Sequence, residues 1–231
     1  MSRSAGGGVD PRWNNLVAGW KLDEYSDGLG AVARADVLGV YELTDNNTVA
    51  SAAGKIDNGA SFVALNSEAL SNATLEIARN WANGLTIAFW IKPLILDGTD
   101  TLMSQYFTGK QVLFNVFAAG NLLFNYTGQD GVASLAASGN GTILIGSWYF
   151  VAAWFDPADG KARLSLNDGV VKVGAATTTI TNAKSTSFSI GNLTVASTDS
   201  VVDEFYIFDR VKDAAWITDM YNAGAGRGYP S

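Results

Sequence analysis

The sequence predicts one all-β domain, a jelly-roll β-sandwich that ends in a single short C-terminal helix. Three observations lead to this fold class. Several segments alternate apolar and polar residues with a period of two, which is typical of half-buried strands. Gly, Asn and Asp recur at short intervals between these segments, as turns between many strands require. The length of 231 residues lies in the range of about 200–250 residues that all-β sandwiches reach as one domain.

The strands of the middle of the chain are predicted from their alternation. In residues 86–92 the side chains of Ile87, Phe89 and Ile91 share one face. Residues 112–116 and 122–126 alternate around a Gly120-Asn121 turn and are predicted to form a hairpin. Residues 148–155 are apolar on both faces, which indicates a central strand that is buried on both sides.

The C-terminal third adds further strands and the helix. A turn at residues 156–160 leads into strands at 162–166, 188–190 and 201–208. Asp213 is predicted to cap the helix, because its carboxylate can accept hydrogen bonds from first-turn amides. Gly224 is the predicted C-terminal stop. The apolar stripe of this helix is predicted to consist of Ala214, Ile217, Met220 and Tyr221.

The chain is predicted to consist of a flexible N-terminal arm, residues 1–11, and one domain, residues 12–231. The arm is small, polar and Gly-rich, and it ends at Pro11. It has no apolar segment of the kind that a secretory signal carries, so we expect synthesis in the cytoplasm without export by that route. No run approaches the ~20 apolar residues of a membrane span, so no membrane partner is expected.

Composition excludes several kinds of chemistry. The chain has no cysteine and no histidine, so disulfides, Cys-ligated zinc, imidazole metal sites and Ser–His or Cys–His nucleophile systems are excluded. The net charge of −7 repels phosphate backbones, so no nucleic-acid partner is expected. The same charge leaves carboxylates for a hard cation such as Ca²⁺, although it also serves solubility alone.

Five motifs follow one another along the chain: residues 19–28 (GWKLDEYSDG), 54–62 (GKIDNGASF), 85–93 (LTIAFWIKP), 148–153 with 162–169 (WYFVAA, ARLSLNDG), and 202–210 with 221–224 (VDEFYIFDR, YNAG). Their order resembles the laminin G-like domains of the concanavalin A-like superfamily, of the kind found in phage and bacterial surface proteins. The resemblance spans about residues 16–226. Phe150 stands where that family often has a histidine that packs, which leaves the fold expectation intact.

The resemblance implies the fold and leaves the function open, because this fold hosts lectins, adhesion modules, glycanases and virion parts. The glycanase branch carries acids in the pattern Glu-x-Asp-x-x-Glu, which this chain lacks. The adjacent pairs Asp23/Glu24 and Asp203/Glu204 are expected to point to opposite faces of a strand, so neither pair can flank one glycosidic bond. The chain is therefore predicted not to be an enzyme. A glycan hydrolase that draws its acids from two strands remains the less favoured alternative.

Calcium is the one cofactor that the resemblance implies. Relatives often hold Ca²⁺ with carboxylates and backbone carbonyls near the paired terminal strands. The matching residues here are Asp23, Asp27 and Asp203, which could supply the oxygen ligands that Ca²⁺ takes. The alternative is that Asp23 and Asp203 cap turns or pair with Lys21 and Arg210.

Aromatic side chains are the candidates for ligand binding, because aromatic rings offer flat apolar surfaces for sugar C–H faces. Most lie at alternating strand positions, where they are expected in the core. The four that lie near predicted turns are the candidate ligand-binding residues: Trp81, Tyr106, Phe107 and Tyr126.

These observations favour a structural or adhesive protein on a virion surface, synthesised in the host cytoplasm. It would be a phage capsid decoration, head-fibre or tail-fibre component, with its N-terminal arm contacting other virion proteins. The domain could also bind host surface glycans. The alternative is a free carbohydrate-binding, lectin-like module. The sequence leaves open whether the chain forms a homo-oligomer.

Overall fold

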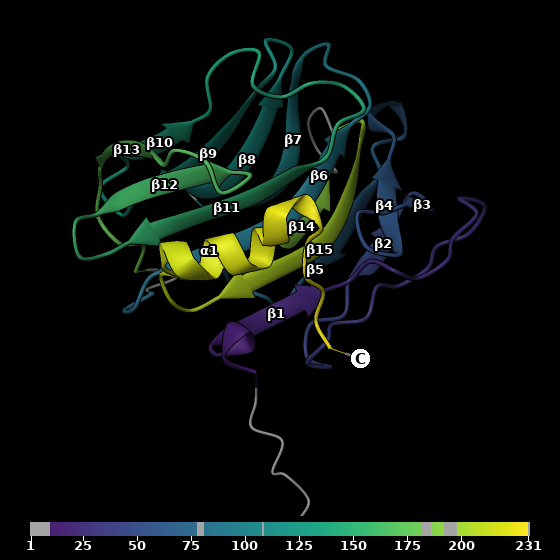
Figure 1. The fold of residues 1–231 in the computed structure, drawn as a ribbon, viewed down its shortest axis with the longest axis horizontal. Helices are drawn as coiled ribbons and strands as arrows, with labels where there is room; N and C mark the ends of the chain where they lie inside the picture. The colour runs from purple at the N-terminus through teal and green to yellow at the C-terminus, as the bar shows by residue number, and fades with distance from the viewer. Residues whose placement is uncertain (1–9, 78–80, 108, 182–185, 192–197, 231) are drawn as a thin grey trace, which may run out of the picture.

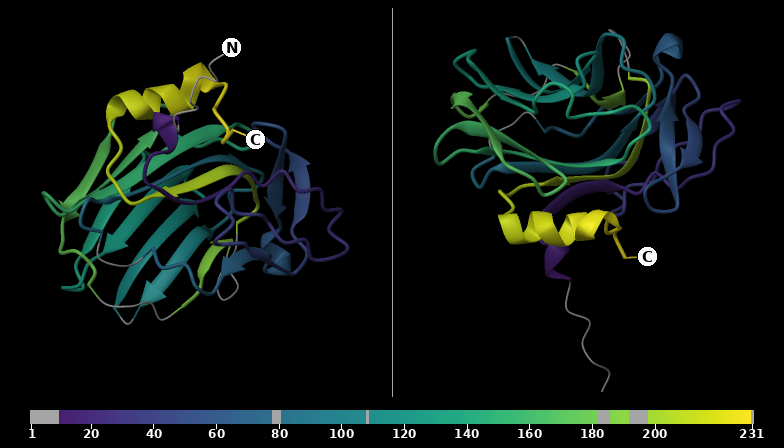
Figure 2. Two further views of the ribbon diagram at one scale, coloured as in Figure 1. Left: turned by 90° about the horizontal axis from the view of Figure 1, so that it is seen from below. Right: turned by 45° about the horizontal axis from the view of Figure 1, so that its top comes forward.

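Two antiparallel β-sheets packed face to face make up the fold, with one short helix outside them (Figures 1 and 2). The computed structural model describes residues 10–77, 81–107, 109–181, 186–191 and 198–230. The predicted all-β sandwich with a C-terminal helix is confirmed.

The larger sheet contains eight strands of the described chain. Its order is β13-β12-β11-β6-β15-β4-β3, and β1 pairs with β15 beside β4. The strands are β1 (Leu16–Trp20), β3 (Ala50–Ala53), β4 (Asn58–Phe62), β6 (Leu85–Pro93), β11 (Tyr149–Asp156), β12 (Lys161–Leu166), β13 (Lys172–Ala176) and β15 (Ser200–Phe208).

The smaller sheet contains seven strands of the described chain, in the order β10-β9-β8-β7-β14-β5-β2. The predicted hairpin is confirmed, because β8 and β9 pair with Phe114 opposite Phe124. The strands are β2 (Thr44–Asn46), β5 (Ala69–Asn72), β7 (Thr99–Phe107), β8 (Lys110–Phe117), β9 (Asn121–Thr127), β10 (Ala133–Ala137) and β14 (Phe188–Gly191).

Aromatic rings fill the space between the sheets. Phe89 of β6 stacks on Phe205 of β15, with ring centroids 5.0 Å apart, and meets the edge of Phe114 of β8 at 5.1 Å. All three side chains are fully buried. Because alternate residues of a strand face the same way, the apolar half of each strand converges on this layer.

The outer face of the larger sheet is also apolar, and helix α1 (Ala214–Tyr221) covers it (Figure 1). Strand β11 is therefore buried on both faces, as predicted. Phe150 packs beside Trp90, with ring centroids 5.3 Å apart, so it is a packing residue.

The helix begins as predicted and ends earlier than predicted. The Asp213 carboxylate accepts a hydrogen bond from the Trp216 amide at 2.8 Å. Asn222, in the left-handed conformation, ends the helix in place of Gly224. The buried face consists of Trp216, Ile217 and Met220, whereas Ala214 is exposed. The described residues also form three 3₁₀ turns: η1 (Pro11–Trp13), η2 (Ala64–Asn66) and η3 (Asn222–Gly224).

The N-terminal segment of the described chain lies against the C-terminal helix (Figures 1 and 2). The indole N–H of Trp216 donates to the Arg12 carbonyl at 2.9 Å, and Lys212 Nζ donates to the Asn14 carbonyl at 2.7 Å. Asp10 caps η1, whose first residue is Pro11. The last two residues of the predicted arm therefore belong to the domain, because they form a capped turn on it. Residues 1–9 of that arm lie outside the described residues.

No helix in the described part of the chain is long and apolar enough to cross a membrane.

Replacing Phe89 by Ala is expected to lower the free energy of unfolding by about 3–5 kcal/mol, because it leaves a cavity between the sheets. The matched control is Leu65→Ala, whose side chain is exposed, and it is expected to change that energy by less than about 0.5 kcal/mol. Urea unfolding followed by tryptophan fluorescence measures both. Equal effects of the two substitutions would contradict the position of Phe89 in the core.

Candidate functional site

Strand β15 changes partners halfway along its length. Its first residues, Ser200 to Val202, pair with β4, and its last residues, Phe205 to Phe208, pair with β1. The register with β6 shifts between Asp203 and Tyr206, and Glu204 has φ 52°. This β-bulge lies where the strand passes from one neighbour to the other. Bulges redirect side chains and are frequent beside functional sites.

The bulge brings two acidic side chains to the same face of the larger sheet. Asp203 lies opposite Trp90, whose ring belongs to the cluster under α1. The Glu204 carboxylate accepts a hydrogen bond from the hydroxyl of Tyr206, which belongs to the same cluster. The prediction that these neighbouring acids point to opposite faces is therefore wrong, because the bulge interrupts the alternation of the strand.

Both carboxylates are buried and hold other segments onto the sheet. Asp203 Oδ2 accepts hydrogen bonds from the amides of Lys55 and Ile56, at 2.7 and 2.9 Å. The Tyr206 hydroxyl, bound to Glu204, accepts one from the Tyr229 amide at 2.8 Å. The two acids thus anchor the loop before β4 and the C-terminal tail. Asp203 does not pair with Arg210; it caps a turn.

Burial dominates the electrostatics of this pair. It raises the pKa of Asp203 to about 7, against the opposing effect of the Ile56 and Lys55 amides, and Asp23 raises it further. Burial likewise raises the pKa of Glu204 to about 8; the Tyr206 hydroxyl lowers it, whereas Asp203 and Asp23 add to the rise. Lys21 is the cation that acts on Glu204, and it lies 4.0 Å from Asp23 Oδ2.

The three predicted calcium ligands are only partly brought together. Asp203 Oδ1 is buried without a hydrogen-bond partner, and Asp23 is close enough to raise the pKa of Asp203. Asp27 is exposed and accepts a hydrogen bond from the Leu29 amide at 3.0 Å. Among the residues that the structure describes, no group of three or more acidic side chains could hold a metal ion. Asp203 and Asp23 thus fit part of a calcium site, and calcium binding stays a prediction.

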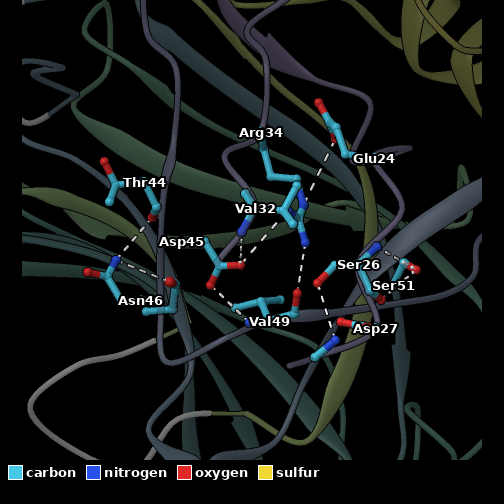
Figure 3. Close-up of polar contacts among 12 residues, drawn as sticks. Glu24, Ser26, Asp27, Val32, Arg34, Thr44, Asp45, Asn46, Val49 and Ser51 are labelled. Carbon is cyan, nitrogen blue, oxygen red and sulfur yellow. Dashed lines mark hydrogen bonds and ion pairs between the residues drawn. The ribbon is translucent and has the colours of Figure 1, made fainter. Parts of the chain in front are cut away.

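Glu24 belongs to a second buried network, which shapes the long segment between β1 and β3 that includes β2 (Figure 3). Arg34 is fully buried and donates to the Val49 carbonyl at 2.9 Å. The Asp45 carboxylate accepts from the amides of Val32 and Val49, both at 2.9 Å. Glu24 Oε2 lies 3.9 Å from Arg34 Nε. The Glu24 carboxylate therefore stabilises this segment of the chain.

The four aromatic candidates have different environments. Trp81 and Tyr126 lie in the core, where Tyr126 stacks on Phe155 at 3.8 Å. Their ring faces are therefore covered by protein, because the alternation of β9 turns Tyr126 inward. Tyr106 of β7 is half-buried. Phe107 pairs with Lys110 through its backbone, and its side chain lies outside the described residues.

Tyr106 lies on the outer face of the smaller sheet, which is rich in polar side chains. Core residues Met103 and Val112 point inward, so their strand neighbours point outward. The register gathers hydroxyl and amide side chains from five strands on this face, and Leu113 and Leu123 lie among them. Most of these side chains are largely covered by their neighbours. We call the polar residues of this surface the polar face; it consists of Ser71, Ser104, Tyr106, Gln111, Asn115, Asn125, Thr127 and Ser189.

The polar face has its own hydrogen bonds and spare capacity. Ser104 Oγ and Ser189 Oγ are 3.1 Å apart, and Thr127 Oγ1 donates to Asn125 Oδ1 at 3.0 Å. Asn115 Nδ2 donates to Thr101 Oγ1 at 3.3 Å. Each amide retains a group, Asn125 Nδ2 and Asn115 Oδ1, without a partner among the described residues. Neither hydrophobic cluster of the described chain includes a side chain of this face.

Sequence reasoning missed the polar face, although part of its signal is visible. The polar positions of 111–115 and 125–127 alternate with the core positions that predicted the strands. Their gathering into one surface depends on the pairing of β14 between β5 and β7, which joins segments far apart in the sequence.

Comparisons with known proteins agree with this architecture. Residues 57–218 match the family model of the concanavalin A-like lectin/glucanases superfamily. A comparison with curated proteins finds no match. Among solved structures, the binding domain of Paraclostridial mosquitocidal protein 1 has a TM-score of 0.75 at 15% identity, over 92% of this chain and 53% of that domain.

Two further structures show the same fold. The binding domain of botulinum neurotoxin serotype G has a TM-score of 0.69 at 13% identity, over 91% of this chain and 51% of that one. A Trypanosoma rangeli sialidase has a TM-score of 0.62 at 15% identity, over 92% of this chain and 33% of the sialidase. This chain thus spans about half of the binding domains and a third of the sialidase.

The buried acids predict that the free energy of unfolding falls as the pH rises. Their pKa values are raised in the folded state, so the folded protein binds more protons; the resulting stability is fully present below the unfolded-state values near pH 4 and is lost as the pH passes 7 to 8. Urea unfolding between about pH 5 and pH 9 measures this decline.

Glu204→Gln is expected to flatten the decline, because an amide has no proton to lose. Glu42→Gln, at an exposed position, serves as the matched control and should leave the pH profile unchanged. A decline of the same size in Glu204→Gln would mean that other groups cause it.

Proposed function

Because the chain belongs to the concanavalin A-like lectin/glucanase superfamily, we propose that it is a non-catalytic module that binds surface glycans through its polar face. The observation that carries the proposal is the difference between the two outer faces. The larger sheet has an apolar outer face, which α1 seals. The smaller sheet carries hydroxyl and amide groups on its outer face.

The chemistry of the polar face suits sugars. Sugar hydroxyl groups both donate and accept hydrogen bonds, as do Ser, Asn and Gln side chains. Tyr106 at one end of the face adds a ring on which a sugar can stack. From Gln111 to Phe117, strand β8 extends for about 20 Å, and Phe117 at the far end is half-buried. An extended oligosaccharide fits a strip of this length.

The placement of the acids supports a binding role without catalysis. A glycosidase needs two carboxyl groups on either side of the scissile bond. Asp203 and Glu204 are adjacent, but both are buried; Asp203 is hydrogen-bonded to the loop before β4 and Glu204 to the hydroxyl of Tyr206. Glu24 lies beside the buried Arg34.

The similar structures offer a precedent for binding at their own surfaces. The binding domain of botulinum neurotoxin DC has been solved in complex with SialylT, and also in complex with rat synaptotagmin II. This chain spans about half of that domain, so the position of those partners does not carry over. The precedent supports a glycan or a protein as the class of ligand.

Within this function, we propose that the chain is a virion surface protein of a bacteriophage, made in the host cytoplasm. The Gly-rich residues 1–9 precede a segment that is docked beside the C-terminal helix by Trp216 and Lys212. An arm that leaves from such an anchored point can contact other virion proteins while the domain faces outward. The alternative is a free lectin-like module.

Purified phage particles from the organism that encodes the chain are expected to contain it. Deleting residues 1–9 should remove the chain from particles without lowering its thermal unfolding temperature, because the docked segment begins at Asp10. Quantitative mass spectrometry measures how much of each chain the particles contain, and thermal unfolding of the purified chains compares their stability. Particles that lack the full-length chain would contradict the virion role and leave the free module.

A glycan array is expected to show binding that depends on the polar face. Asn125→Ala should weaken it roughly fivefold, as the loss of about 1 kcal/mol per hydrogen bond implies, and Tyr106→Ala should also weaken it. The matched controls are Asn140→Ala and Tyr25→Ala, at exposed positions elsewhere, which should bind like the parent. Binding that survives both polar-face substitutions would contradict this surface.

The same array in EDTA tests the calcium prediction. If Asp203 and Asp23 hold Ca²⁺ that supports binding, EDTA weakens the signal and added calcium restores it. Isothermal titration with calcium alone then shows heat for the parent and none for Asp203→Asn. Equal binding in EDTA, together with no calcium heat, removes calcium from the proposal.

A further inference from the structure

Three loops meet at the end of the sandwich that lies away from the N-terminal segment. They are residues 94–98, 118–120 and 141–146, which we call the rim. The Ala118 amide donates to the Gly98 carbonyl at 2.6 Å, and the Ile143 amide donates to the Gly120 carbonyl at 2.9 Å. The Gly146 amide donates to the Pro93 carbonyl at 2.8 Å. The rim is therefore one continuous surface.

Aliphatic side chains are exposed on the rim. The exposed fractions are 40% for Leu94, 45% for Ile95, 58% for Leu144 and 59% for Ile145. Beside them lies a groove of about 330 Å³, lined by Leu96, Ala118, Ala119, Gly120, Gly141, Ile143, Leu144 and Ile145. Side chains of this kind gathered on one surface are typical of a site where another molecule binds.

Three carboxylates lie at the same end. Asp100, the second residue of β7, is 5% exposed, and its carboxylate accepts no hydrogen bond from a described residue. Burial raises the pKa of Asp100 to about 6, and the nearby carboxylates of Asp97 and Asp199 raise it further. The backbone of Asp199 is bonded to the rim, because its carbonyl accepts from the Leu94 amide at 2.8 Å, and its carboxylate accepts from the Ala64 amide at 3.1 Å. No described lysine or arginine forms a salt bridge with any of the three.

We propose that the rim binds a segment of a partner protein that carries a lysine or arginine flanked by aliphatic side chains. The aliphatic side chains fill the groove and cover Leu94, Ile95, Leu144 and Ile145. The cation relieves the repulsion among the three aspartates. Charge complementarity of this kind selects partners and speeds their encounter.

Charge also decides against the other occupants. A second copy of this chain, docked rim to rim, would bring the same carboxylates together, and each copy carries a net charge of −7. An anionic membrane surface is repelled for the same reason. A neutral glycan gains little from exposed leucine and isoleucine. The basic, aliphatic peptide segment is the occupant that satisfies both features.

The position of the rim suits this role. At one end of β6, Thr86 pairs with Phe208, which also pairs with Leu16 next to the N-terminal segment. At the other end, Pro93 pairs with Ser200 beside the rim. Seven residues of strand separate the two ends by about 23 Å. A domain anchored near its N-terminal segment therefore presents the rim outward. This inference is independent of the proposed glycan surface, since the rim loops contain none of the residues of the polar face.

The test is selection of a displayed library of random short peptides on the full-length chain, in EDTA so that no metal ion neutralises the aspartates. Peptides that also bind the double variant Ile95→Asn/Ile145→Asn are removed. The remaining peptides are expected to be enriched in Lys or Arg next to Leu, Ile or Val. Their affinity, measured by fluorescence anisotropy, should fall about tenfold or more in the double variant.

Two single variants separate charge from shape. Asp97→Asn, at an exposed position, should weaken binding about threefold and reduce its dependence on salt. Leu29→Asn, exposed in the loop between β1 and β3, is the matched control and should bind like the parent. Unchanged thermal unfolding of all variants shows that the fold is intact.

Selection that yields no rim-dependent peptides, or rim-dependent peptides that are acidic or lack a basic residue, would overturn the proposal. Sedimentation that shows a dimer of the parent, dissociated by Ile95→Asn/Ile145→Asn, would assign the rim to self-association and overturn it as well. Neither outcome affects the glycan array, so the two functions are tested separately.

Discussion

Strand β15 must be buried along its whole length, and the rest of the structure depends on this constraint. All nine of its residues are buried. Val202, Phe205 and Ile207 belong to the core between the sheets, whereas Tyr206 and Phe208 pack under α1. One strand thus joins the inter-sheet core, the helix and the docked N-terminal segment.

The burial of β15 forces its polar residues to find partners inside the protein. A buried polar group without a partner costs more free energy than a hydrogen bond returns. Asp203 accepts hydrogen bonds from the loop before β4. Glu204 accepts one from the Tyr206 hydroxyl, which in turn accepts one from the C-terminal tail. The buried guanidinium group of Arg34 likewise finds a partner inside the protein, because it donates to the Val49 carbonyl. These buried charged groups hold irregular segments to the sheets. The adjacent acids Asp203 and Glu204 therefore have a structural role.

The contrast between the outer faces follows from how each sheet is covered. Helix α1 covers the middle of the larger sheet, so the outer positions beneath the helix are aromatic and aliphatic. The smaller sheet carries mostly polar side chains on its outer face, with a few leucines among them, and its inner positions on β8 and β9 are apolar. The surfaces with capacity to bind are therefore the polar face and the rim, and they differ in chemistry. One offers hydroxyl and amide groups, and the other offers aliphatic side chains beside carboxylates.

The sequence by itself determined the features that depend on neighbouring residues. Alternation predicted the β8–β9 hairpin, a continuous apolar run predicted the two-sided burial of β11, and the carboxylate of Asp213 predicted the start of the helix, because each signal lies within a few neighbouring residues. Tertiary structure alone decided the rest. Trp81 and Tyr106 both lie near turns, yet one is in the core and the other is on the polar face. The bulge at Asp203 and Glu204 exists because β15 passes from β4 to β1 there, and pairing between segments more than a hundred residues apart has no local signal.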